Sequence, residues 1–201
     1  MPLFMEQTTI PDCYILNPFV FEDERGYFVK VYHQDIFFEN GLETNFTEEY
    51  YTFSRKRILR GLHFQLPPHD HTKLVFCIAG RVLDAVIDLR VGSPAYGKYE
   101  MFDLNIENKK IIYIPNGLAH GFYVMSESAI LVYKTTTVYS QEHDSGILWN
   151  SAGVPWPDKQ PIISRRDSEF MTMTDFISPF IFKERKLSMN TMQQDLTNSN
   201  F

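Results

Sequence analysis

Five polar side chains that can do chemistry fall within fourteen residues of this chain: Arg60, His63, His69, His71 and Lys73. The apolar run 74–79 follows them directly, and a polar cluster beside a buried strand is typical of a lined pocket. Histidine can ligate a metal or act as a base near neutral pH, and lysine can stabilise an oxyanion. Metal binding and proton transfer are therefore the two kinds of chemistry to separate.

The metal hypothesis depends on segment 115–120, whose Pro-x-Gly-x-x-His pattern resembles an element of the cupin superfamily, an all-β jelly roll in which that histidine often binds metal. Cupins add a glutamate seven residues before a glycine, and Lys73 occupies that position here. His69, His71 and His120 offer an alternative three-histidine site, but a lysine brings positive charge where a divalent cation needs a carboxylate. We therefore expect no metal, and we place His69 and His71 in a loop.

The proton-transfer hypothesis uses a different set of side chains. His63 is a natural base near neutral pH, Lys73 can stabilise an enolate, and a tyrosine hydroxyl from Tyr133 can donate a proton. Such a set suits removal of a proton next to a carbonyl and its return on the opposite face. Each residue also has an ordinary alternative, because Tyr133 can be a sheet aromatic and His63 a core histidine. Tyr139 is expected to line the pocket, with a contribution to catalysis as the alternative.

Short strands must position these side chains. Strand signals recur about every ten residues, separated by Gly, Pro and Asn turns, which indicates an all-β barrel or sandwich; they cover 46–53, 74–79, 82–89, 99–104, 110–114, 121–124 and 129–136. Short helices are expected at 35–41 and within 167–182, and segment 140–167 is expected to wrap the barrel. We predict one domain over 1–182, followed by a polar, flexible tail over 183–201.

Composition excludes several classes of protein. The 201 residues are 44% apolar and 15% aromatic, enough for a sizeable core, and the net charge of −6 argues against a general nucleic-acid or anionic-membrane surface. The apolar runs are too short to cross a bilayer, and the first residues do not resemble a secretory signal. We therefore expect a cytoplasmic protein in which Cys13 and Cys77 are reduced.

Beyond these single residues, the order of the motifs is similar to that of the dTDP-4-dehydrorhamnose 3,5-epimerase family. The resemblance runs from about residue 18 to residue 168, and eight motifs in one order are far more specific than any one of them. They are Asp23-Glu24-Arg25-Gly26-Tyr27-Phe28, Arg60-Gly61-Leu62-His63-Phe64-Gln65, Lys73-Leu74-Val75, Val86-Ile87-Asp88-Leu89-Arg90, Ser93-Pro94, Ile114-Pro115-Asn116-Gly117-Leu118-Ala119-His120-Gly121-Phe122, Tyr133-Lys134 and Ser164-Arg165-Arg166-Asp167.

The resemblance implies an all-β cupin or jelly-roll barrel with a few short peripheral helices. It also implies a metal-independent homodimer that inverts C3 and C5 of a nucleotide-diphosphate 4-keto-6-deoxy sugar, in deoxysugar and polysaccharide biosynthesis, without a cofactor. In these terms His63 resembles the base and Asp167 the carboxylate that orients it. Tyr133 resembles the proton donor, and Lys73 the residue beside the C4 oxygen.

The substrate-binding positions carried over from the resemblance include Arg166, where a typical member has lysine. The full set that we expect at the substrate is Arg25, Phe28, Lys30, Glu48, Tyr50, Arg60, Gln65, His120, Tyr139, Asp144 and Arg166.

Three departures from the family fall together at the nucleotide end. Lys30 replaces a glutamate, 48–50 replaces Gln-Asp-Asn, and Asp144 replaces a glutamate. Thymine presents an N–H donor that a carboxylate accepts and a lysine does not. The alternatives left open are the same chemistry on a CDP- or GDP-linked sugar at one centre only, a non-catalytic sugar-binding cupin, and a metal-dependent cupin.

Overall fold

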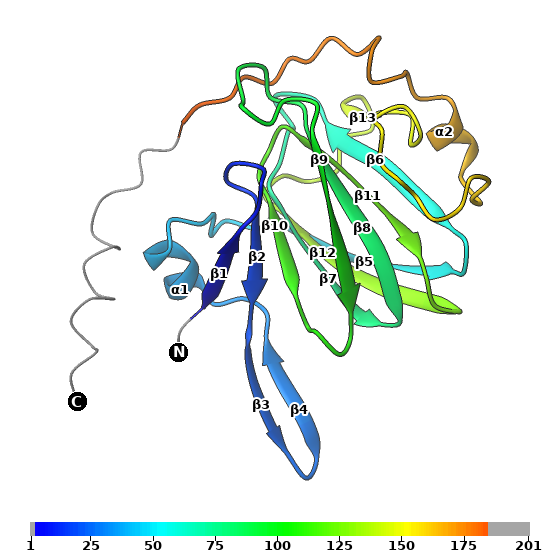
Figure 1. The fold of residues 1–201 in the computed structure, drawn as a ribbon. Coiled ribbons are helices and arrows are strands. Elements are labelled where there is room, and N and C mark those ends of the chain that lie inside the picture. Colours follow the sequence, from blue (N-terminus) through cyan, green and yellow to red (C-terminus); the bar gives the residue numbers. More distant parts are fainter. Residues whose placement is uncertain (1–2, 185–201) are drawn as a thin grey trace.

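The computed structural model describes residues 3–184, and its strands pair antiparallel in two large sheets and one hairpin (Figure 1). The larger sheet has the order β1 (Phe4–Gln7), β2 (Tyr14–Asn17), β10 (Ile111–Ile114), β7 (Lys73–Ala79), β12 (Ser128–Thr135) and β5 (Glu48–Arg55). The second has the order β13 (Asp144–Gly146), β6 (Leu59–Gln65), β11 (Leu118–Val124), β8 (Arg81–Asp88) and β9 (Tyr99–Asn105). The predicted all-β jelly roll is confirmed.

Apolar side chains from both sheets meet in one core. Val75 and Leu131 come from the larger sheet, Val86 and Phe122 from the smaller, and all four belong to one buried cluster. Strand β12 shows how the sequence specifies this packing, because every second residue from Ala129 onward is buried, as expected for a strand with one covered face.

Strand β11 is buried at all seven positions, because the chain after β13 covers the outer face of the smaller sheet. Trp156 and Phe180 from this segment pack with Leu62 and Ala119 of the sheet. The expectation that the chain beyond residue 140 wraps the barrel therefore holds, except that β13 itself joins the smaller sheet beside β6.

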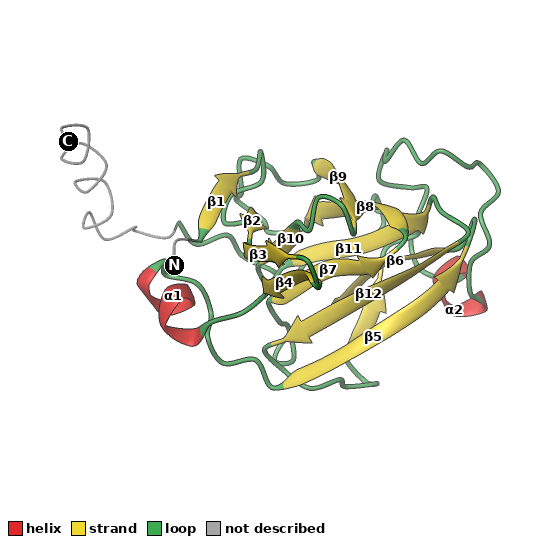
Figure 2. Cartoon of the chain, turned by 90° about the horizontal axis from the view of Figure 1, so that it is seen from below, coloured by secondary structure: helices red, strands yellow, loops and turns green. Residues whose placement is uncertain are grey.

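Two short helices lie at opposite ends of the molecule (Figure 2). Helix α1 (Gln34–Glu39) agrees with the predicted helix at 35–41. Helix α2 (Arg165–Ser168) is a single turn that begins earlier than predicted, and Ser164 caps it by accepting a hydrogen bond from Asp167 N. Most of the predicted flexible tail, from residue 185 onward, lies outside the described residues.

Strands β3 (Phe19–Asp23) and β4 (Gly26–Lys30) form a hairpin that projects away from both sheets (Figure 1). Phe21, Tyr27 and Phe28 on this hairpin are about half exposed. No helix in the described part of the chain is long and apolar enough to cross a membrane.

Strands β6 and β11 approach closely at a pair of glycines. The register between these strands shifts between His120 and Phe122, where Gly121 lies against Gly61. A Cβ added to Gly121 would lie 2.7 Å from the carbonyl oxygen of Arg60 and 2.9 Å from the Cα of Gly61. The backbone therefore leaves no room for a side chain here.

We predict that Gly121→Ala destabilises the fold by about 1–3 kcal/mol, the usual cost of overpacking. For a chain of this size that corresponds to a fall of roughly 2–4 °C in Tm for each kcal/mol, measured by calorimetry. Gly153→Ala is the control, since a Cβ there meets nothing within 4 Å and only the left-handed backbone is strained. A Tm for Gly121→Ala at or above that of Gly153→Ala would contradict this account of the strand contact.

Candidate active site

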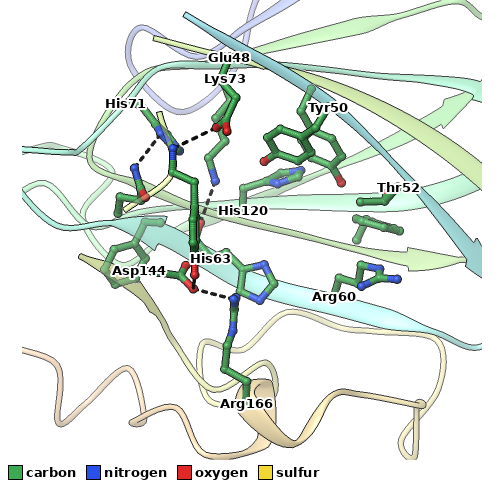
Figure 3. A pocket seen from close by; sticks show the side chains of 15 residues that line it. Glu48, Tyr50, Thr52, Arg60, His63, His71, Lys73, His120, Asp144 and Arg166 are labelled. Atoms are coloured by element: carbon green, nitrogen blue, oxygen red, sulfur yellow. Dashed lines mark hydrogen bonds and ion pairs between the residues drawn. The ribbon is translucent and has the colours of Figure 1, made fainter. Parts of the chain in front are cut away.

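A cavity of about 450 Å³ opens between the two sheets (Figure 3). Both sheets contribute to its lining, together with α2 and the loop before β7. The lining residues are Glu48, Tyr50, Thr52, Arg60, His63, Phe64, Gln65, His71, Lys73, His120, Phe122, Tyr133, Tyr139, Asp144 and Arg166. Three of the four predicted catalytic residues therefore line one cavity, and the fourth, Asp167, lies directly behind His63.

His63 and Asp167 form a partly buried hydrogen-bonded pair. The imidazole Nε2 of His63 is 2.9 Å from Asp167 Oδ1, and Asp167 Oδ2 accepts a hydrogen bond from the backbone N–H of Gly61 at 3.1 Å. A carboxylate that accepts from Nε2 leaves Nδ1 as the nitrogen that can take up a proton. Nδ1 has no hydrogen-bond partner among residues 3–184.

The surroundings of this pair favour a neutral imidazole beside a charged carboxylate, which is the protonation state that a base requires. Desolvation lowers the pKa of His63, as do the positive charges of Arg166 and Lys73, while Asp167 acts in the opposite direction. Burial alone would raise the pKa of the Asp167 carboxyl, but hydrogen bonds from His63 and from the Gly61 N–H bring it below its usual value. The imidazole is therefore neutral, and the carboxylate is charged, near neutral pH.

Lys73 is a buried cation at the start of β7. Its side chain is 5% exposed, and Nζ donates to the backbone carbonyl of His63 at 3.2 Å. Burial lowers the pKa of Lys73 to about 8, with a further lowering by Arg166 and an opposing influence of Asp144 and Asp84. A desolvated ammonium of this kind interacts strongly with negative charge that forms beside it.

Tyr133 points into the cavity from β12, on the sheet opposite His63. Its ring stacks on that of Tyr50, with centroids 4.8 Å apart and planes 11° from parallel. Burial raises the pKa of Tyr133 well above its usual value, and Tyr50 and Asp84 add to this rise. The phenol therefore remains protonated over the whole physiological range and can serve as an acid.

Charged and polar groups gather at the mouth of the cavity. Arg166 Nη1 is 2.6 Å from Asp144 Oδ2, and the Tyr139 hydroxyl donates to the same oxygen at 3.4 Å. The backbone N–H of Tyr139 donates to Glu48 at 3.1 Å. Arg60 donates through Nε to Ser54 at 2.9 Å, and its guanidinium lines the cavity (Figure 3). The mouth thus presents two guanidinium groups and two carboxylates.

Three of the predicted substrate-binding residues lie elsewhere. Arg25, Phe28 and Lys30 belong to the β3–β4 hairpin and do not line the cavity of their own chain. Arg25 instead pairs with Asp23 at the exposed tip of the hairpin. The structure therefore brings the other eight predicted binding residues together but not these three.

His71 has a more specific place than the sequence indicated. It lies in the loop before β7, as expected, but its side chain lines the cavity, with Nδ1 3.1 Å from Thr137 Oγ1. Burial, together with the charge of Lys73, lowers the pKa of His71 to about 3, so the ring is neutral. His69 instead packs against His143, with ring centroids 4.4 Å apart and planes tilted by 36°. Among residues 3–184, no three His, Cys, Asp or Glu side chains are grouped as a metal would require.

Sequence reasoning also missed several residues at the cavity. Thr52, Phe64 and Phe122 line it, and Asp84 lies behind His120, 2.7 Å from its Nε2. A signal for Asp84 was present, because it is a carboxylate flanked by apolar residues in the middle of strand β8. Such a residue in a buried strand needs a partner, and the cavity histidine is that partner.

Comparison with known proteins agrees with this geometry. The profile of the dTDP-4-dehydrorhamnose 3,5-epimerase family matches residues 7–175. The dTDP-4-dehydrorhamnose 3,5-epimerase of Shigella flexneri is 43% identical over 164 residues, which cover 80% of this chain and 91% of the relative. The dTDP-4-dehydrorhamnose 3-epimerase of Streptomyces niveus is 33% identical over 156 residues, covering 76% of this chain and 75% of the relative.

A solved structure gives the same result. The dTDP-6-deoxy-D-glucose-3,5-epimerase of Legionella pneumophila Philadelphia 1, in complex with dTDP-4-keto-L-rhamnose, superposes with a TM-score of 0.85 at 32% identity. The match covers 90% of this chain and 100% of that chain. The chain therefore belongs to the dTDP-4-dehydrorhamnose 3,5-epimerase family of isomerases.

Proposed function

We propose that this protein inverts C3, C5 or both in a dTDP-linked 4-keto-6-deoxy hexose, as a cytoplasmic enzyme of deoxysugar biosynthesis. The observation that carries the proposal is the placement of a base and an acid on facing sheets. His63 is on β6 of the smaller sheet and Tyr133 on β12 of the larger, so a sugar held between them meets the base on one face and the acid on the other.

The proposed steps need only groups of this chain. The C4 ketone acidifies the neighbouring C–H, and His63 Nδ1 takes that proton while Asp167 stabilises the imidazolium that forms. The electron pair moves to the C4 oxygen, where the Lys73 ammonium stabilises the enolate. Tyr133 then gives its hydroxyl proton to the opposite face of the same carbon, and solvent exchange restores both side chains. Neither oxidant nor reductant is consumed.

Cations near the mouth suit the diphosphate. The guanidinium of Arg60 donates to the side chain of Ser54, and Arg166 reaches the same cavity from α2. A guanidinium can bind phosphate oxygens through two parallel N–H groups. We infer that the diphosphate lies between these two residues and that it competes with Asp144 for Arg166.

The proposal takes thymidine as the nucleotide because the relatives that match carry dTDP in their names. The departures at Lys30, Glu48 and Asp144 keep a CDP- or GDP-linked sugar as the alternative. Inversion at C3 alone is the second candidate for the reaction, because the chain is also similar to the Streptomyces niveus 3-epimerase.

We further propose that the protein acts as a homodimer. The hairpin carries three predicted binding residues away from their own cavity and leaves Phe19, Phe21 and Phe28 exposed. Strand β5 adds the exposed side chains Tyr51 and Phe53 at the edge of the larger sheet. Contact with a second copy would bury this apolar surface. It would also allow Arg25, Phe28 and Lys30 to reach the cavity of the partner subunit.

We predict that the wild-type protein incorporates deuterium at C3 or C5 of dTDP-4-keto-6-deoxyglucose in D₂O, measured by NMR and mass spectrometry. His63→Asn should reduce the rate about 100-fold or more, since a general base contributes at least this much. His33→Asn is the matched control, because His33 precedes α1 at the other end of the molecule.

Each other outcome of this experiment has a distinct meaning. No incorporation by the wild type would indicate a binding protein without turnover. Equal rates in His63→Asn and the wild type would remove His63 from the role of base. If the same experiment on the CDP- or GDP-linked sugar gave faster exchange than on the dTDP-linked sugar, cytidine or guanosine rather than thymidine would be the nucleotide of the substrate.

The dimer proposal predicts complementation between two impaired variants. Arg25→Ala and His63→Asn are each expected to be nearly inactive alone. Unfolded and refolded together in equal amounts, they should recover roughly a quarter of the wild-type activity, because half of the dimers are heterodimers and one of the two sites in each heterodimer is intact. The measurement is turnover of the mixture against each variant refolded alone. Activity that never exceeds the mean of the two separate variants would contradict a site shared between subunits.

A further inference from the structure

Asp84 is a buried carboxylate that the mechanism above does not use. It lies on β8 with a side chain that is 0% exposed, and Oδ2 accepts a hydrogen bond from His120 Nε2 at 2.7 Å. The other oxygen, Oδ1, has no hydrogen-bond partner among residues 3–184. A buried carboxylate with an unpaired oxygen is costly, and an apolar side chain of similar size often gives a more stable core. Its presence therefore points to the cavity rather than to the fold.

A second carboxylate on the same strand shows the contrast. Asp88 is also 0% exposed, but both of its oxygens are hydrogen-bonded. Oδ1 accepts from the backbone N–H and Nε of Arg90, each at 2.9 Å, and Oδ2 accepts from Arg90 Nη2 and from the Ser93 hydroxyl. Asp88 thus has the complete partner set of a structural ion pair, whereas Asp84 has one histidine.

The position of His120 explains what Asp84 orients. His120 on β11 lies directly opposite His63 on β6 in the sheet register, and each histidine bonds through Nε2 to a buried aspartate. A carboxylate acceptor requires the proton on Nε2 of His120, and it fixes the ring against rotation. The side chain of His120 lies at the cavity between Lys73 and Tyr50 (Figure 3).

Asp84 also acts on Lys73 by its charge. The titratable and charged groups that face Lys73 are Asp144 on β13, Asp84 on β8, Arg166 on α2, and the neutral rings of His63 and His71. The two carboxylates favour the ammonium, and Arg166 opposes it. Asp144 is already paired with Arg166 at 2.6 Å, so much of its charge is offset. The influence is mutual: burial is the larger effect and raises the pKa of Asp84 above its usual value, while His120 and Lys73 act to lower it.

We propose that Asp84 is a positioning residue of this site. Its carboxylate holds His120 in one orientation and one tautomer, and it keeps the Lys73 ammonium charged beside the reacting ketone. The inference rests on the proposed epimerase function. Without the carboxylate, Lys73 loses its proton more readily, and the enolate oxygen then loses its cation.

The test is the pH dependence of kcat in Asp84→Asn, which keeps the shape of the side chain and removes its charge. The pKa of Lys73 at about 8 predicts that wild-type kcat falls as the pH rises through that value. Because a neighbouring negative charge raises the pKa of a lysine, its removal should move this fall to lower pH, by roughly one unit. A loss of packing alone would not move it.

Asp88→Asn is the matched control, since it makes the same change at an equally buried position of the same strand. It should lower Tm, because Arg90 loses its partner, and leave the pH dependence unchanged. Asp84→Ala is the second variant, and it should shift the pH dependence in the same direction as Asp84→Asn.

Two results would overturn the proposal. One is a pH dependence of kcat in Asp84→Asn or Asp84→Ala that is the same as in the wild type. The other is failure of both variants to fold, which would mean that Asp84 serves the stability of the fold. Absence of epimerase activity in the wild type would instead refute the proposed function. The effect of the Asp84 charge on the pKa of Lys73 would then still be measurable by NMR titration of ¹³C-labelled lysines, with the Lys73 signal assigned from Lys73→Arg. An unchanged Lys73 titration in Asp84→Asn would refute the inference.

Discussion

Charge enclosed between two apolar sheets is the constraint on which this site depends. Lys73, Asp84 and Asp167 are each 5% exposed or less, so none of them can rely on water. Each must find its partner among neighbouring buried groups, and these pairings govern the charge state of each side chain. Burial leaves His63 neutral, keeps Tyr133 protonated and brings the pKa of Lys73 to about 8. The reactivity that we propose is a consequence of this enclosure.

The fold provides the enclosure through the pairing of its strands. His63 and His120 lie on adjacent strands of the smaller sheet, at the point where Gly61 and Gly121 let those strands approach each other. Lys73 and Tyr133 lie on adjacent strands of the larger sheet. The single turn of α2 adds Asp167 behind His63 and Arg166 at the mouth. The opposed sheets thus fix which groups meet each face of a bound ring.

Much of this arrangement could be predicted from the sequence, because alternating burial and glycine turns specify the strands, and the ordered motifs specify His63, Lys73, Tyr133 and Asp167. What the sequence could not indicate depends on tertiary placement. His71 appeared to be an ordinary loop residue, since nothing local shows that its loop folds over the cavity. For Arg25 the sequence predicted a place at the cavity, but the residue lies on the hairpin away from the cavity of its own chain. A motif can indicate a residue's role, but it does not say which cavity the residue reaches.

The central claim is that base and acid act from opposite faces of one sugar, and Tyr133→Phe in D₂O tests it most directly. The phenylalanine keeps the stack on Tyr50 and removes only the hydroxyl. His63 should still exchange the C3 or C5 proton and return deuterium to the face from which it came, while formation of the inverted sugar falls about 100-fold or more. Inversion at the wild-type rate, or loss of exchange together with inversion, would contradict the account.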